Sequence, residues 1–292
     1  MKRKLIRQGG SGLTLYVPKK WVDEHSLKPG DEVEVERTGE DLILSSQTKT
    51  IKPKEITIDL PDSREITIRT FLVNAYRAGY DRFYVYYLGN PLTLTQLVTD
   101  QLIGFEVFSQ KEEQFIIESV AEPSYENFET LIQKQFFFLL QILHDVDTTP
   151  VKEVVHRVQK YDNFLKRCLT KKVLTSQAFP FLWQFLSELT HIARQCYHFN
   201  YYLQKNKIQL DVIDKKLLEQ AQGLLRLLQK AYLNNDLTSL TQLQDTAQPL
   251  IYEKIPHLLS SKNPVTMYYL VSLIRTFYLA TSPLTGIIQM RS

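Results

Sequence analysis

The sequence predicts a multidomain α+β protein with an N-terminal β module, a small α+β connector and a C-terminal all-α helical bundle. Three zones of hydrophobic patterning support this prediction. Apolar residues alternate up to about residue 46, strand and helix patterns mix up to residue 121, and apolar residues then recur every three or four positions. The predicted domains cover residues 1–48, 51–121 and 124–283.

The first zone alternates apolar and polar residues as a β-strand does. A short helix is expected after Pro18, and residues 38–41 have the composition of a hairpin turn. About 46 residues in this pattern are too few to enclose a core, so we expect an obligate dimer that shares strands. The apolar sets are Leu13, Leu15 and Val17, then Val33 and Val35, then Leu42 and Leu44.

The connector mixes both kinds of pattern, as a small α+β unit does. Its predicted helices cover residues 70–78, ending at Gly79, and residues 92–103, ending at Gly104. Its predicted strands cover residues 55–60, 65–68, 82–87, 105–109 and 114–120. Pro123 and Ser124 mark the boundary with the last zone.

The last zone is helical throughout, and its first three helices have apolar seams that predict packing against other helices. Three more helices are expected over residues 211–233, 237–259 and 264–280. Six helices fit two three-helix layers or one extended bundle. The seams are Phe128, Ile132, Phe136, Leu139, Leu143 and Val146; Val151, Val154, Val158, Tyr161, Leu165 and Cys168; and Leu182, Phe185, Leu189, Ile192, Cys196, Phe199 and Leu203.

The overall composition is that of a soluble cytoplasmic protein. The chain has 292 residues, of which 43% are hydrophobic and 23% charged. Two cysteines, Cys168 and Cys196, are too few for a disulfide scaffold and fit a reducing compartment. The longest apolar run, residues 136–140, is far shorter than a membrane span, so we expect no membrane insertion.

The charge is distributed unevenly, although the net value is only +3. Residues 1–20 contain six basic residues and no acid, whereas residues 21–41 contain eight acids and two bases. A dimer would double the basic segment, and such a surface suits the backbone phosphates of double-stranded DNA. The candidate DNA-binding residues are Lys2, Arg3, Lys4, Arg7, Lys19 and Lys20.

Five short motifs follow one another in the first 33 residues. They are a basic first strand with Lys4 and Arg7, a Gly/Ser loop at 9–12, Pro18-Lys19, a short helix at 21–25 and a Leu-x-x-Gly-Asp-x-Val motif at 27–33. This segment resembles the AbrB/SpoVT/MazE swapped-hairpin DNA-binding domain. The resemblance implies an interleaved dimer in which Lys4, Arg7, Lys19 and Lys20 face DNA.

The connector segment IRTFLVNAYRAGYDRFYVYY precedes paired three-helix patterns. In this organisation the chain is similar to archaeal phosphate-uptake regulators, which fuse an AbrB domain to a PhoU-like helical domain. The resemblance implies a cytoplasmic regulator linked to phosphate uptake, whose helical domain senses a signal or docks a protein partner. It also implies, in some members, metal clusters on Glu/Asp-x-x-x-Asp motifs.

Those metal motifs are incomplete in this chain. Asp162 lies where a family acid is expected, but Val158 stands one turn earlier, and Glu188 is followed four residues later by Ile192. Glu188, His191, Gln195 and His198 form a polar row that could bind a transition metal. A half-solvated helix face is the favoured interpretation of this row. We therefore expect neither a metal nor another cofactor, with Asp162, Glu188, His191 and His198 as the candidate ligands.

No Ser/His/Asp or Cys/His constellation is present, so we expect no enzymatic activity. The sequence predicts a DNA-binding transcriptional regulator that forms a homodimer or a higher even oligomer. One alternative is an adaptor that controls a transporter complex without binding DNA, and another is an antitoxin-like autorepressor. The basic first strand favours DNA binding over the adaptor, and the long helical half disfavours the antitoxin.

Overall fold

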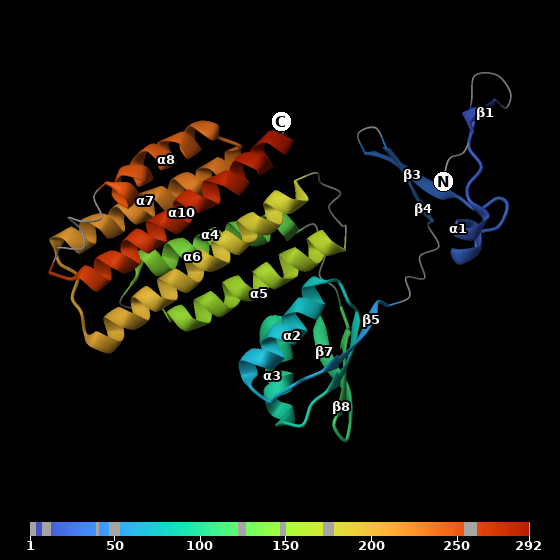
Figure 1. The fold of residues 1–292 in the computed structure, drawn as a ribbon, viewed down its shortest axis with the longest axis horizontal. Coiled ribbons are helices and arrows are strands. Elements are labelled where there is room, and N and C mark those ends of the chain that lie inside the picture. Colours follow the sequence, from blue (N-terminus) through green and yellow to red (C-terminus); the bar gives the residue numbers. More distant parts are fainter. Residues whose placement is uncertain are drawn as a thin grey trace. The chain divides into compact units, whose positions relative to one another are not determined.

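The computed structural model describes residues 4–7, 13–38, 41–46, 53–121, 127–146, 150–171, 178–253 and 262–291. The chain divides into two compact units, residues 1–53 and 54–292 (Figure 1). The first contains β-strands and a short helix, and the second contains a mixed sheet followed by long helices. The predicted fold class, a multidomain α+β protein with a helical C-terminal part, is confirmed.

The first unit consists of two β-ribbons and one short helix. Strand β1 (Ile6–Arg7) pairs antiparallel with β2 (Leu13–Thr14), and helix α1 (Lys19–Glu24) follows Pro18. Strands β3 (Val33–Thr38) and β4 (Asp41–Ser46) form an antiparallel hairpin in which Thr38 lies opposite Asp41. The predicted hairpin is therefore confirmed, while Gly39, Glu40 and the glycine loop at 9–12 lie outside the described residues.

The second unit begins with a four-stranded sheet in the order β5-β6-β8-β7. Strand β5 (Glu55–Asp59) is parallel to β6 (Arg82–Tyr86), because helix α2 (Glu65–Arg77) makes the crossover between them. Helix α3 (Pro91–Gln101) leads into the antiparallel strands β7 (Phe105–Lys111) and β8 (Gln114–Ser119). Their apolar faces share one core with the helical bundle.

The strand predicted over residues 65–68 is wrong, because these residues form the first turn of α2. Ile68 is fully buried and Ile66 is 63% exposed. An alternation over only four residues does not distinguish a strand from one turn of a helix. Glu65 pairs with Arg69 one turn later, and an acid in the first turn also favours the helix dipole. The helix therefore starts five residues earlier than predicted.

The remaining chain forms a bundle of long helices that lie side by side (Figure 1). Helix α7 starts with a capping box, in which Asp211 accepts from the Asp214 N–H and Asp214 accepts from the Asp211 N–H. It ends at Asn235, which has a φ of 52°. The bundle helices are α4 (Phe128–His144), α5 (Val151–Thr170), α6 (Phe179–Asn206), α7 (Val212–Asn234), α8 (Leu237–Tyr252) and α10 (Pro264–Arg291).

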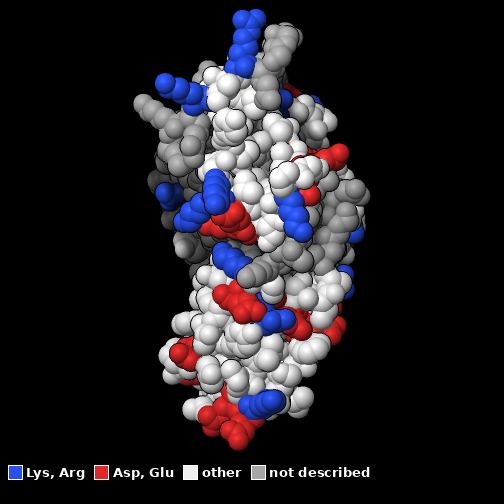
Figure 2. Space-filling model, turned by 90° about the vertical axis from the view of Figure 1, so that its right-hand side faces the viewer, with Lys and Arg blue, Asp and Glu red and all other residues white. Residues whose placement is uncertain are grey.

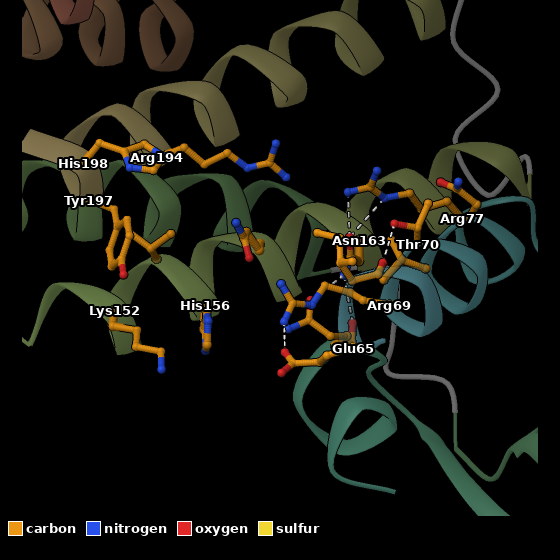
Figure 3. A pocket seen from close by; sticks show the side chains of 16 residues that line it. Glu65, Arg69, Thr70, Arg77, Lys152, His156, Asn163, Arg194, Tyr197 and His198 are labelled. Atoms are coloured by element: carbon orange, nitrogen blue, oxygen red, sulfur yellow. Dashed lines mark hydrogen bonds and ion pairs between the residues drawn. The ribbon is translucent and has the colours of Figure 1, made fainter. Parts of the chain in front are cut away.

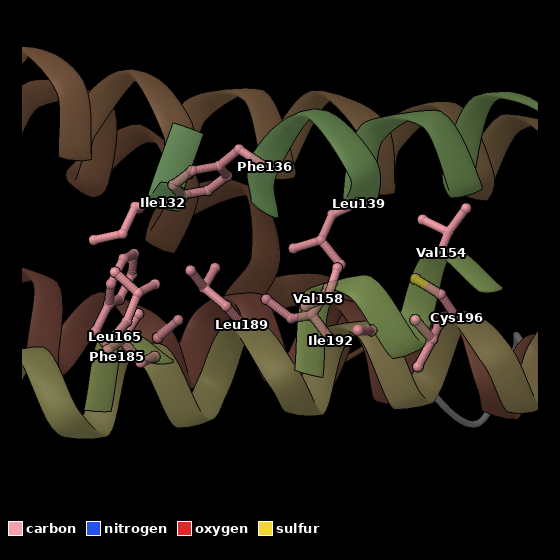
Figure 4. Close-up of a cluster of buried hydrophobic side chains, with 14 of the residues drawn as sticks. Ile132, Phe136, Leu139, Val154, Val158, Leu165, Phe185, Leu189, Ile192 and Cys196 are labelled. Carbon is pink, nitrogen blue, oxygen red and sulfur yellow. The ribbon is translucent and has the colours of Figure 1, made fainter. Parts of the chain in front are cut away.

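The three predicted seams form the interior of this bundle (Figure 4). Val158 of α5 and Leu189 and Ile192 of α6 are completely shielded from solvent. Tyr161 is the one seam residue that is only partly buried. The spacing of three and four thus identified the packed faces correctly.

The last helix, α10, differs from its predicted extent. It continues through Pro283 to Arg291, beyond the predicted end at residue 280. Among the described residues it is the one helix long and apolar enough to cross a membrane, but 67% of its most apolar window is buried inside the protein. Contacts with α6, α7 and α8 make α10 a central core helix of the bundle.

Buried ion pairs connect the sheet to helix α5. The Arg77 guanidinium donates to Asp162 at 2.6 Å and to the side-chain oxygen of Asn163 at 2.7 Å. Arg167 donates to Asp81 at 2.7 Å and to the Tyr80 carbonyl at 2.6 Å. Since these pairs join α2 and the α2–β6 turn to α5, the sheet and the bundle form a single unit.

Candidate nucleic-acid interface

The N-terminal unit exposes the apolar side chains that its strand pattern would bury. No described apolar side chain between residues 4 and 46 is buried, and helix α1 contains no buried residue. Leu13 is 64% exposed, and Val35 and Leu42 are 56% and 68% exposed. A single copy of this unit therefore has no core among its described residues, and a partner surface must supply one.

The β3–β4 hairpin shows which face requires that partner. Val35 lies opposite Leu44, and Val33 lies opposite Ser46, so these side chains point to the same face. Leu42 belongs to this face as well, because it lies two residues from Leu44. The predicted alternation thus gathers four apolar residues on one face of the hairpin, beside Ser46.

The candidate basic residues lie on β1 and on the first turn of α1. Arg7 is opposite Leu13 in the β1–β2 ribbon, and Lys4 is two residues before Ile6. Lys19 and Lys20 begin helix α1, and all four basic side chains are exposed. The two remaining candidates, Lys2 and Arg3, lie outside the described residues.

These basic groups are weakly neutralised. In the part of the chain that the structure describes, Lys4, Arg7 and Lys19 form no ion pair, while Lys20 lies 3.8 Å from Glu24 on the exposed face of α1. Such an exposed pair contributes little to stability and leaves the lysine available. In Figure 2, lysine and arginine side chains protrude as separate groups from the visible face. The four exposed basic groups in or beside β1 and on α1 lie on two segments, and a second copy would double their number.

A tight turn connects α1 to the following hairpin. The Asp31 N–H donates to the Lys28 carbonyl at 3.0 Å, and the Asp31 carboxylate accepts from the Lys28 N–H at 2.6 Å. Gly30 has a φ of 99°, which a residue with a side chain rarely adopts. This geometry explains the Pro-Gly-Asp motif and sets the direction in which the chain leaves the helix.

The four candidate metal ligands lie in different surroundings. Asp162 is fully buried and is already paired with Arg77 and with Lys166 at 2.9 Å. Glu188 lies 3.5 Å from the Nδ1 of His191, while His198 lines a cavity together with Arg194. Among the described residues, no three His, Cys, Asp or Glu side chains converge as a metal site requires. The absence of a bound metal remains a prediction.

Sequence reasoning missed the side chains that surround Asp162. Arg77 and Lys166 occupy its oxygens, and burial lowers the pKa of Lys166 while the Asp162 charge opposes this change. Lys166 was detectable as the residue four positions after Asp162, a spacing that favours ion pairs on a helix. Arg77 was not detectable, since it lies 85 positions away.

Comparison with known proteins supports the assignment of the N-terminal module. Residues 6–55 match the family described as "Antidote-toxin recognition MazE, bacterial antitoxin". Neither a curated protein nor a solved structure gives a match to the chain. The matched segment contains both ribbons and helix α1, with Arg7, Lys19 and Lys20. The chain therefore has a MazE/AbrB-like domain at its N-terminus, followed by a helical C-terminal region.

Proposed function

We propose that this protein is a homodimeric or higher even-oligomeric DNA-binding regulator of transcription. The observation that supports the proposal most strongly is the uncovered apolar face of a MazE/AbrB-like unit that also exposes basic side chains. Dimerisation covers the apolar face and brings two sets of basic groups together. The DNA-binding residues are Lys2, Arg3, Lys4, Arg7, Lys19 and Lys20.

Contacts with phosphate groups supply the affinity in this proposal. Each lysine or arginine that neutralises a phosphate releases counterions, so affinity falls as salt increases. The basic groups lie on a short strand and a helix start, and base recognition would come from other side chains. Binding is therefore expected to be strongly salt-dependent and partly independent of sequence.

A second candidate function is an antitoxin-like autorepressor. The description of the matched family supports it, since that description names a bacterial antitoxin. In this case the helical region would neutralise a toxin, and the basic module would repress the operon that encodes both. A small toxin reading frame beside the gene, and a complex with its product, would favour this function over the simple regulator.

The helical region is proposed as a PhoU-like domain that senses a signal or docks a protein partner, in a cytoplasmic regulator linked to phosphate uptake. The paired three-helix pattern and its buried seams support this proposal. The proposed domains cover residues 1–48, 51–121 and 124–283. We propose no catalytic role for any of them. A variant of this proposal is an adaptor that regulates a transporter complex without binding DNA.

The decisive experiment measures DNA affinity of the full chain by fluorescence anisotropy between about 50 and 200 mM salt. We expect replacement of Lys4, Arg7, Lys19 and Lys20 by Ala to weaken binding to every duplex. Each lost phosphate contact should also lower the slope of log K against log salt by about 0.9. The matched control replaces four exposed basic residues of the second unit, Lys215, Lys216, Arg226 and Lys262.

The control variant should retain the parent affinity and slope. If the N-terminal variant binds DNA as tightly as the parent, the proposed interface is wrong. If the parent itself binds no duplex at low salt, DNA binding is excluded and the adaptor becomes the preferred function.

A further inference from the structure

A cavity of about 630 Å³ lies between α2, α5 and α6 of the second unit (Figure 3). Its volume is within the range that small-molecule sites usually have. Basic and imidazole side chains from all three helices surround it. These are Arg69 and Arg77 of α2, Lys152 and His156 of α5, and Arg194 and His198 of α6.

Positive charge in the cavity exceeds negative charge. Four arginine or lysine side chains line it, but Glu65 is the one carboxylate among the lining residues. Glu65 is paired with Arg69, and Arg77 is paired with Asp162 behind the wall. Within the described ranges, Lys152 and Arg194 form no ion pair.

Arg194 is the clearest unneutralised group. Its side chain extends from α6 toward Arg77 of α2, so two guanidinium groups approach each other across the cavity (Figure 3). Burial lowers the pKa of Arg77, Asp162 raises it, and the charge of Arg194 lowers it further. Water reduces the repulsion between the two guanidinium groups because Arg194 is exposed, and an anion bound between them would reduce it further.

Two further observations concern His156 and Arg69 in the wall of the cavity. Burial lowers the pKa of His156, and the charges of Arg69 and Lys152 lower it further, while Asp100 and Glu65 oppose them. The Nε of Arg69 is buried and has no hydrogen-bond partner among the described residues. A buried N–H without a partner costs free energy, and this cost would fall if a ligand oxygen accepted a hydrogen bond from it.

We propose that this cavity binds a small phosphorylated molecule, with Arg69, Arg77 and Arg194 as the groups that contact its phosphate oxygens. Guanidinium groups form charge-assisted, bidentate hydrogen bonds with phosphate, and they approach here from two different helices. A tetrahedral phosphate accepts hydrogen bonds from several directions, whereas a planar carboxylate accepts them near one plane. Tyr197 lines the same cavity and provides an aromatic wall for the organic part of the ligand.

A small molecule suits this site better than duplex DNA does. The basic groups line a concave cavity between helices, whereas a DNA backbone requires an extended basic surface. The site also involves only the second unit, so it does not depend on the proposed function of the first. Its ligand would bridge α2 beside the sheet and α6 of the bundle, and would stabilise their arrangement.

The test uses inorganic pyrophosphate as the probe and the full-length protein. Isothermal titration calorimetry at pH 7.5 should show one site per chain, and saturating pyrophosphate should raise the melting temperature above that in sodium chloride of equal ionic strength. We expect Arg194→Gln to weaken pyrophosphate binding about tenfold, the loss of one charge-assisted contact. Arg226→Gln, which changes an exposed arginine of α7 outside the cavity, should leave binding unchanged.

Three results would overturn the proposal. The first is the absence of pyrophosphate binding beyond the effect of ionic strength. The second is an equal loss of binding in the Arg194→Gln and Arg226→Gln variants, since this would mean non-specific attraction. The third is tighter binding of citrate than of pyrophosphate, which would assign the site to carboxylates. If the first result is obtained and the Arg194→Gln variant also loses DNA affinity, the cavity is a DNA contact instead.

Discussion

Arg167 shows how a single charged residue joins the sheet to the bundle. Its side chain is 1% exposed and donates to the Tyr76 and Tyr80 carbonyls and to the Asp81 carboxylate. The guanidinium also lies 4.8 Å from the centre of the Phe105 ring. Asp81 would keep Lys171 as a partner without Arg167, but the two carbonyls would each lose a donor.

Replacement of Arg167 by Met should therefore destabilise the second unit by about 3 kcal/mol, because the Tyr76 and Tyr80 carbonyls each lose a buried donor. The expected change is a lower urea midpoint for the full-length protein, followed by tryptophan fluorescence. Arg226→Met, at an exposed position of α7, should stay within about 0.5 kcal/mol of the parent. Equal midpoints for the two variants would show that Arg167 does not hold the sheet on the bundle.

At the scale of the element, helix α10 packs closely against α6. A Cβ added at Gly286 would lie 2.5 Å from a ring carbon of Phe181, which is less than any real contact of this kind. A Cβ added at Gly223 of α7 would meet nothing within 4 Å. The two glycines therefore have different roles, although both lie within helices.

This difference predicts opposite effects of the same substitution. Gly223→Ala should stabilise the protein by about 0.5 to 1 kcal/mol, because alanine favours the helix. Gly286→Ala should destabilise it by about 1 to 3 kcal/mol, because overpacking against Phe181 outweighs the same gain. Thermal unfolding of the two variants measures both effects. A higher melting temperature for Gly286→Ala would mean that α10 is not packed tightly against α6.

At the scale of the whole molecule, the uncovered face of the N-terminal unit predicts self-association. We expect light scattering to give the mass of a dimer or an even multiple of it. Val35→Asp together with Leu42→Asp should halve that mass, since two charges on this face oppose burial. Ile213→Asp is the matched control, because Ile213 is a 54% exposed apolar residue in the first turn of α7. A parent protein that is monomeric would contradict the shared-strand argument.

Local patterns were sufficient for much of the fold, since helices and half-buried strands depend on neighbours in sequence. The seams of α4, α5 and α6 and the β3–β4 hairpin were predictable for this reason. Short segments were less certain: four alternating residues at 65–68 belong to a helix, and Pro283 lies inside α10 instead of ending it. At 65–68 the following residues of α2 decide the structure, whereas the helix around Pro283 continues within a segment packed against α6, α7 and α8.

The sequence by itself determined the basic N-terminal segment, the MazE/AbrB-like motifs and the apolar helix faces, because each is a property of neighbouring residues. Only the tertiary structure decided which charges meet. It paired Asp162 with Arg77, and it placed Arg69, Lys152 and Arg194 around one cavity although they are far apart in sequence. Charge interactions depend on distance in space and on burial, and spacing along the chain determines neither for residues on different helices.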